Sequence, residues 1–395
     1  MMAPVPPDRP PLEGCRVLDL GIITAGAATS ALLADLGAEV IKVESPTYRD
    51  PFRVWTEPGA PAGRMPPFFR ATNRNKAGIS IDLKHPDGRA ALLRLARRSD
   101  VVVENFRRGV LARFDLGYDV LRGANPDIVL ASISSQGETG PDAGYVSYGS
   151  TLEAVSGLAW AGGYADGGPV VSGRDLNYPD QVVAIFAAGM IATAWRASRS
   201  GAGGTHLDLS QRELTSFLLG EAFVAAEEPA RRGNAQPPHR LQDCFRDAAG
   251  RWVAVTVDDR DLPALDRLLG LPAGAGDAAR RTALAGWIAG RDAAAAVAGL
   301  AALSIAAAPV LGGRDLAEHE GRLWAMAMTH AADGAWLKGF PFQLEEAPLS
   351  VRRDAPGVGA DTARVLMEIA GYSAAEVAAL AAGGVIEVAA GAGAA

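Results

Sequence analysis

The sequence is poor in the residues that most often mark disulfides, metal sites and catalytic triads. Only two of the 395 residues are cysteines, Cys15 and Cys244, and neither has a second cysteine at the spacing of a zinc site. None of the five histidines has a serine, cysteine or aspartate at motif spacing. These shortages argue against a disulfide framework, a zinc centre and triad chemistry.

Long apolar runs and blocks of basic residues are missing as well. No segment approaches the uninterrupted run of about 18 apolar residues that a membrane helix needs. The N-terminal MMAPVPPDRPPLEG is rich in proline and lacks the basic-then-apolar order of a secretion signal. The net charge is -7 and the basic residues are scattered. We therefore expect a cytoplasmic protein without membrane or nucleic-acid partners.

Strand and helix patterns alternate along the first 135 residues. A β-rich run at 15–21 precedes small residues and leucines at 24–38 that suit a helix, and a second strand follows at 39–45. The alternation returns around Val101–Val103 and again near residue 130. Such βαβ units build a parallel sheet with helices on both faces, so the sequence predicts a doubly wound α/β layer.

The remaining sequence predicts a second unit, because 395 residues exceed the size at which a single core usually stops growing. Alanine-rich helices are expected over 151–225, interrupted by GAGG, and residues 226–250 are polar and contain prolines. A strand at 251–257 and two following helices suit a smaller α+β domain. Strand-like runs at 308–313 and 339–344 and a helix at 362–370 close the chain.

Short polar motifs stand where the predicted strands end. They are VES at 43–45, NRNK at 73–76, VENFRRG at 103–109 and SISSQGETG at 132–140. The chain has no GxxxxGK[ST], and its first βα turn reads GIITAGA rather than GxGxxG. Because ligands gather at the carboxyl ends of parallel strands, these motifs predict a binding site, although solvated turns would look the same.

These segments, taken in order, resemble class III CoA-transferases. The resemblance rests on LEGCRVLDLG, LLADLGAEVIKVES, NRNK with SIDLK, SDVVVENFRRGV, SISSQGETGP and the closing APGVGADTARVLMEIAGYSAAEVAAL, and it spans nearly the whole chain. The family includes formyl-CoA transferase, carnitine CoA-transferases and α-methylacyl-CoA racemases. It implies transfer of coenzyme A from an acyl-CoA to a carboxylic acid, with acyl-CoA as substrate and no permanently bound cofactor or metal.

The resemblance also implies a domain plan and an assembly. A Rossmann-like large domain and a smaller α+β domain are expected, with boundaries at 1–200 (large), 201–229 (helical linker), 230–325 (small) and 326–395 (large again). Two chains would form an interlocked dimer. The glycine-run lid of formyl-CoA transferase has no counterpart in RRGNAQPPHRLQD, so a heterodimer in which this chain is a non-catalytic or weakly active subunit stays open beside a homodimer.

The family nucleophile is an aspartate before a long alanine-rich helix, and Asp180 in YPDQVVAIFAAG matches it. Asp175 is the competing candidate. We favour Asp180 because the positive end of a helix would keep its carboxylate ionised and ready to attack. The alternative is an aspartate that only caps the helix. In the implied mechanism the carboxylate forms a mixed anhydride and then an aspartyl-CoA thioester.

Further site residues follow from the resemblance position by position. Glu138 matches an active-site glutamate, although it would equally serve to cap a turn. The cofactor-binding positions are Thr24, Ala25, Lys76, Asn105, Phe106 and Arg113, of which Lys76 and Arg113 would offset phosphate charge. Racemases of the family need a histidine and an aspartate as acid and base, but Tyr145 and Val146 occupy those places.

The acid substrate is the least defined part of the prediction. The stretch that leads to Asp180 is similar to the branch of the family that uses larger or dicarboxylic acids. Trp160 and Tyr164 would supply an apolar wall, and Arg174 would pair with a second carboxylate of an acid such as succinate. As an alternative, Arg174 pairs with its neighbour Asp175.

Overall fold

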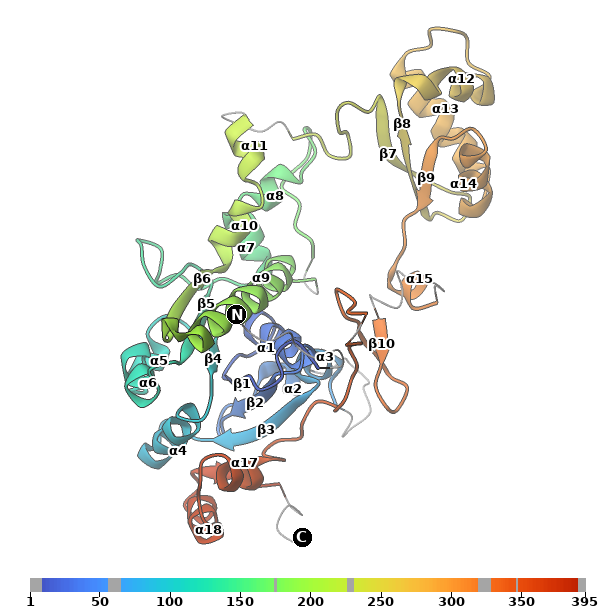
Figure 1. The fold of residues 1–395 in the computed structure, drawn as a ribbon. Helices are drawn as coiled ribbons and strands as arrows, with labels where there is room; N and C mark the ends of the chain where they lie inside the picture. Colours follow the sequence, from blue (N-terminus) through green and yellow to red (C-terminus); the bar gives the residue numbers. More distant parts are fainter. Residues whose placement is uncertain are drawn as a thin grey trace. The chain divides into compact units, whose positions relative to one another are not determined.

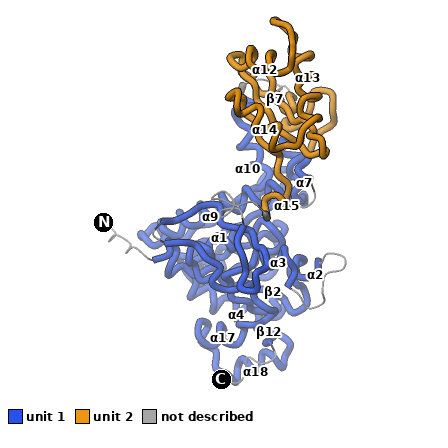
Figure 2. The backbone as a smooth tube through the Cα atoms, turned by 90° about the vertical axis from the view of Figure 1, so that its right-hand side faces the viewer, with its two compact units in different colours: residues 1–158, 171–224, 325–395 blue, residues 159–170, 225–324 orange. Residues whose placement is uncertain are grey.

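The computed structural model describes residues 9–55, 65–173, 176–225, 231–318, 328–345 and 347–389. The chain divides into two compact units, which Figure 2 shows in different colours. The first unit comprises residues 1–158, 171–224 and 325–395, and the second comprises residues 159–170 and 225–324. The chain therefore leaves the first unit and returns to it near the C-terminus.

A seven-stranded sheet forms the centre of the first unit, in the order β12–β3–β2–β1–β4–β5–β6. The strands from β1 to β6 pair in parallel, and β12 pairs antiparallel with β3. This is the doubly wound order, which confirms the predicted α/β layer. The strands are β1 (Arg16–Asp19), β2 (Glu39–Glu44), β3 (Lys76–Ile81), β4 (Val101–Glu104), β5 (Val129–Ser134), β6 (Thr205–Ser210) and β12 (Ile386–Glu387).

Helices cover both faces of this sheet (Figure 1). On one face, α4, α6, α17 and α18 enclose strand residues such as Ile41 and Ile79. On the other, α1 and α9 bury side chains that include Leu33 and Val183 against Val103. Strands covered on both faces read as continuous apolar runs, which explains the sequence of β4.

The helices of the first unit vary widely in length. They are α1 (Ala25–Asp35), α2 (Pro51–Val54), α3 (Pro67–Asn73), α4 (Pro86–Ala96), α5 (Val110–Arg113), α6 (Tyr118–Ala124), α7 (Gly149–Val155), α9 (Tyr178–Ala197), η1 (Ser198–Ala202), α10 (Gln211–Phe217), α11 (Gly220–Ala225), α17 (Thr362–Glu368) and α18 (Ala374–Ala382). The short α8 (Leu158–Ala161) lies at the boundary between the units.

Helix α9 combines a buried face with an exposed apolar one. With η1 it is the one helix in the described part of the chain that is long and apolar enough to cross a membrane, a test that core helices of globular proteins also pass. Val183 and Ile191 pack in the core beside α1 and the sheet. Ile185, Phe186 and Met190 are exposed on the same helix.

The predicted helical linker at 201–229 is wrong at its start. Residues 205–210 form the edge strand β6, parallel to β5, and α10 and α11 follow it. Gly204 makes this pairing possible, because a Cβ there would lie 2.2 Å from the Ile128 carbonyl oxygen. The alternation in THLDLS has the period of a strand, a signal that the long neighbouring helices obscured.

The predicted strand at 339–344 is also wrong. The antiparallel hairpin of β10 (Met328–His330) and β11 (Trp336–Lys338) lies directly before it. Residues 339–344 themselves have no regular secondary structure. Pro341 within GFPFQL removes a backbone donor, which disfavours a paired strand.

The second unit has a core of its own. Its antiparallel sheet, in the order β7–β8–β9, packs against α12, α13 and α14 through residues such as Val255, Leu265 and Leu284. Three α-helices and the short 3-10 helix η2 follow β8 before β9, where the sequence predicted two helices. The elements are β7 (Leu241–Arg246), β8 (Trp252–Val257), η2 (Asp259–Asp261), α12 (Leu262–Leu269), α13 (Asp277–Ala289), α14 (Ala293–Ala301), β9 (Ala306–Pro309) and α15 (Gly313–Glu318).

Candidate active site

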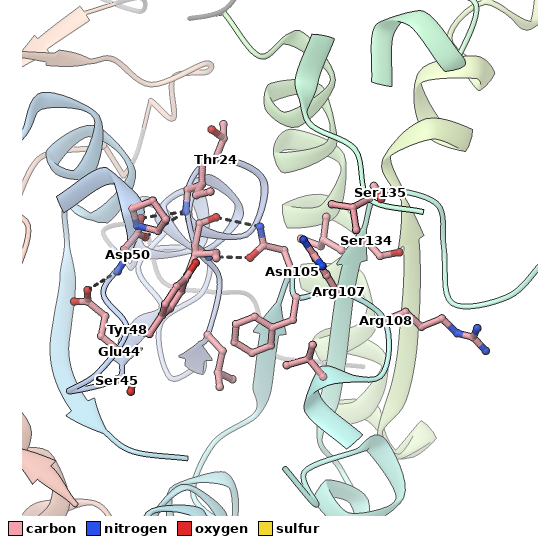
Figure 3. A pocket seen from close by; sticks show the side chains of 18 of the residues that line it. Thr24, Glu44, Ser45, Tyr48, Asp50, Asn105, Arg107, Arg108, Ser134 and Ser135 are labelled. Atoms are coloured by element: carbon pink, nitrogen blue, oxygen red, sulfur yellow. Dashed lines mark hydrogen bonds between the residues drawn. The ribbon is translucent and has the colours of Figure 1, made fainter. Parts of the chain in front are cut away.

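A cavity of about 1110 Å³ opens at the carboxyl ends of the parallel strands. Its walls come from the segments that follow β1 to β5, and Figure 3 shows part of this lining. The strand order reverses between β1 and β4, which is where doubly wound sheets bind their ligands. Three of the predicted polar motifs border the cavity, through Glu44 and Ser45, Asn105 to Arg108, and Ser134 and Ser135.

Hydrogen bonds fix the turn between β1 and α1 beside this cavity (Figure 3). The Asn105 carboxamide accepts from the Ile22 N–H at 2.8 Å and donates to the Ile22 carbonyl at 3.0 Å. Ile23 has a φ of 57°, which a β-branched residue rarely adopts. Its N–H donates to the Asp50 carboxylate at 3.2 Å, and the buried Lys42 pairs with Asp50 at 3.0 Å. These contacts hold a strained turn in place and thereby position the start of α1.

The carboxylate of Asp180 lies in the cavity wall, in the first turn of α9. It accepts hydrogen bonds from its own N–H and from the N–H of Ala25, the first residue of α1. The start of α7 is also adjacent, since a Cβ at Gly149 would lie 3.1 Å from Oδ2 of Asp180. Three helix N-termini therefore surround this group, and each carries partial positive charge.

Burial nevertheless raises the pKa of Asp180 from 3.8 to about 6. The two N–H hydrogen bonds lower the pKa, but the loss of hydration of the charged form outweighs them. The sequence analysis considered only the helix terminus, which favours the ionised form, and therefore predicted a pKa shift in the opposite direction. With this pKa the carboxylate is still mostly ionised at neutral pH while it is partly shielded from water, and both properties suit a nucleophile.

Most predicted cofactor-binding residues lie at the cavity. Thr24, Asn105, Phe106 and Arg113 line it, and Ala25 contributes the N–H to Asp180. Sequence reasoning missed further basic groups in the wall, which are Arg49, Lys84, Arg107 and Arg108. The last three stand within the SIDLK and ENFRRG motifs, but spacing alone did not show that they line the cavity.

Lys76 is not brought to the cavity. Its side chain is fully buried, and its ammonium contacts Asp19 at 2.8 Å, Asn73 at 3.0 Å, Ser30 at 2.9 Å and the Ala27 carbonyl at 2.8 Å. Burial lowers its pKa to about 8. With these four partners the ammonium acts within the core, and this geometry argues against the expected phosphate contact.

Glu138 likewise lies outside the cavity lining. Its N–H donates to both oxygens of Asp208, at 3.1 and 3.0 Å. Its charge acts on the buried Glu104, whose pKa burial raises to about 7. The Glu104 carboxylate accepts a hydrogen bond from the N–H of Phe106 at 2.8 Å. Glu104 therefore helps to position Phe106, which lines the cavity.

Two of the residues expected to contact the acid substrate are among the described residues, and the third is not. Trp160 and Tyr164 belong to the second unit, where the Arg231 guanidinium lies 4.3 Å from the Trp160 ring centre. Arg174 and the competing nucleophile Asp175 lie outside the described residues. Tyr145, at the position of the racemase histidine, is an exposed residue of the cavity wall.

Comparison with known proteins shows the family to which the chain belongs. The model of CoA-transferase family III matches residues 12–362, so the chain belongs to this family of enzymes. A succinate–glutarate CoA-transferase of Agrobacterium fabrum is 35% identical over 70% of this chain and 70% of its own length. An acetyl-CoA:oxalate CoA-transferase of Acetobacter aceti is 34% identical over 66% of this chain and 67% of its own length.

Solved structures show the same fold. The crystal structure of a CAIB/BAIF family protein from Brucella suis superposes with a TM-score of 0.82 at 27% identity. The superposition covers 91% of this chain and 99% of the Brucella suis chain. The match therefore extends over both units, and it supports the mixed α/β architecture built around a mostly parallel sheet.

Proposed function

We propose that this chain transfers coenzyme A from an acyl-CoA to a carboxylic acid through covalent intermediates on Asp180. The observation that carries the proposal is the position of this carboxylate. It is partly buried in the wall of a cavity large enough for coenzyme A and accepts a hydrogen bond from the Ala25 N–H. Relatives are named for succinate, glutarate and oxalate, and from these names we take only that the acid is a small organic acid.

The proposed reaction needs no net proton transfer. An oxygen of Asp180 attacks the thioester carbonyl, the C–S bond breaks, and a mixed anhydride and CoA thiolate result. The thiolate attacks the aspartyl carbonyl and releases the donor acid as a carboxylate. The acceptor carboxylate then attacks the aspartyl-CoA thioester, and the thiolate attacks the acceptor carbonyl of the second anhydride. These steps release the new acyl-CoA and restore Asp180.

The surroundings of Asp180 suit the charges that this route creates. The aspartyl oxygen becomes negative when the thiolate attacks its carbonyl, and the Ala25 N–H already points at this group. Lys84, Arg107, Arg108 and Arg113 would balance the phosphates of coenzyme A from the cavity wall. Exclusion of water protects the anhydride from hydrolysis, and the burial that raises the pKa of Asp180 supports such exclusion.

An assembly and a location belong to the proposal as well. We propose a dimer, since α9 exposes Ile185, Phe186 and Met190, an apolar face that a second chain would cover. We also propose that the enzyme works in the cytoplasm. A racemase is not favoured, because neither Tyr145 nor Val146 supplies an acid or base that exchanges protons near neutral pH.

A transfer assay tests the function. The purified chain is incubated with acetyl-CoA, succinyl-CoA or another acyl-CoA and an isotope-labelled acid, and labelled acyl-CoA is measured by chromatography. We expect transfer by the wild type and none by Asp180→Asn, with binding of free coenzyme A retained by both. If the chain binds coenzyme A but transfers with no pair of substrates, the partner-subunit alternative replaces this proposal.

A further inference from the structure

A second, smaller cavity lies next to the proposed nucleophile. It measures about 260 Å³ and is lined by α1, α3, the start of α9 and the segment after β11. Thr24 lines both this cavity and the large one. The Thr24 hydroxyl is buried and has no hydrogen-bond partner in the described structure. This is expected for a polar group that forms its hydrogen bond with a bound ligand.

The first turn of α9 stands between the two cavities. Asp180 lines the large cavity, whereas Asn177 and Gln181 line the small one. A Cβ at Gly149 would lie 2.8 Å from Oδ1 of Asn177 and 3.1 Å from Oδ2 of Asp180, so both oxygens face the same glycine. The small cavity therefore begins beside the nucleophile.

A thioester needs this arrangement, because two arms diverge from its carbonyl carbon. With the carbonyl at Asp180, the coenzyme A arm occupies the large cavity and the acyl arm enters the small one. The small cavity measures about 260 Å³, which is several times the about 30 Å³ that one water molecule occupies in the liquid, so a short acyl arm has room there. Its walls are largely apolar, with Ala28, Ala31, Leu32, Phe52, Phe68, Ala71, Ala184 and Ile185.

The small cavity also carries an unbalanced positive charge. Of the two cations in its wall, Arg74 is paired with Asp35 at 2.7 Å. The Lys338 ammonium donates to the Gln181 side-chain oxygen and has no carboxylate within ion-pairing distance among the described residues. An ammonium has three donors, so Lys338 has capacity left for an anionic group.

We propose that the small cavity is the acyl subsite and that Lys338 there binds the distal carboxylate of a short dicarboxylic acid. This inference rests on the proposed transfer at Asp180 and adds the substrate class. Gln181 directly follows the nucleophile in α9, and its side-chain oxygen accepts a hydrogen bond from the Lys338 ammonium. A monocarboxylic acid of equal length would fill the apolar part and leave Lys338 unpaired.

The test compares glutarate with valerate as acceptors, with one acyl-CoA donor throughout. We expect the wild type to prefer glutarate in kcat/KM. In Lys338→Met the KM for glutarate should rise about 10- to 100-fold, the range for a lost charge-assisted contact. The kcat and the KM for valerate should change little. Lys338 is exposed, so the variant should fold, and its Tm is measured as a check.

Lys84→Met is the matched control, because Lys84 lines the large cavity. It should raise the KM for the acyl-CoA donor and leave the preference between the two acids unchanged. Transfer with equal use of both acids, or a preference that survives Lys338→Met, overturns the inference while the proposed function stands. Absence of transfer from every acyl-CoA contradicts the proposed function itself.

Discussion

Asp180→Asn should make the protein more stable above about pH 6 while it abolishes transfer. The raised pKa of Asp180, from 3.8 to about 6, means that its ionised form is less favourable in the folded chain than in the unfolded one. A shift of about two units corresponds to about 3 kcal/mol at 1.36 kcal/mol per unit. Since Asp180 is only partly buried, we expect the variant to be about 1–3 kcal/mol more stable toward unfolding than the wild type above about pH 6.

The sign of the pH dependence follows from proton binding. Between about pH 4 and pH 6 the folded chain keeps a proton on Asp180 that the unfolded chain has lost. This contribution to stability is fully present below about pH 4, decreases as the pH rises through the window, and is gone above about pH 6. Asparagine does not titrate, so the stability of the variant relative to the wild type should increase as the pH rises through the same window.

The assay is denaturation of both proteins at about pH 4 and about pH 8, followed by tryptophan fluorescence. The expected result is a small difference at the lower pH and a larger advantage of the variant at the higher pH. Asp127→Asn, an exposed aspartate before β5, is the matched control and should show no such change. An Asp180→Asn protein that is less stable at both pH values would refute the assigned burial of this carboxylate.

Three further predictions concern the same site and its support. The kcat/KM of transfer should fall as the pH drops below about 6, because Asp180 then becomes protonated and cannot attack. A fall with its midpoint near pH 4 instead would contradict the raised pKa of Asp180. Arg113→Ala should raise the KM for acyl-CoA about tenfold with little change in kcat, which steady-state kinetics at constant ionic strength checks. Lys76→Met should lower stability by about 3–5 kcal/mol, because Asp19 is left buried without its partner; a variant with native Tm and weakened binding of coenzyme A would instead support the phosphate role.

Local sequence patterns predicted the doubly wound sheet because its strands are short, apolar and separated by helices. The run at Val101–Val103 illustrates this, since a strand buried on both faces leaves no ambiguity about its environment. Strand β6 was missed because its edge position produces a weak alternating pattern beside the strong helical signal of α9. A hairpin such as β10–β11 depends on pairing over a few residues, which short segments do not specify.

The candidate site was predictable at the level of motifs, and less so at the level of side chains. Asn105 and Phe106, in the motif after β4, line the cavity, because chain order fixes which strand ends meet. The motif NRNK gave no hint that Lys76 points into the core toward Asp19. The direction of the pKa shift of Asp180 could not be predicted from the sequence either. It is set by desolvation, which depends on tertiary packing that the position at a helix terminus does not reveal.

Mapping of the covalent intermediate tests the central claim most directly. The protein is incubated with acyl-CoA donors, trapped with hydroxylamine or borohydride, digested, and analysed by mass spectrometry. The account predicts a modified carboxylate at Asp180, which disappears in Asp180→Asn and identifies the donor that reacted. A modification at another carboxylate, or active transfer without any adduct on the protein, would contradict it.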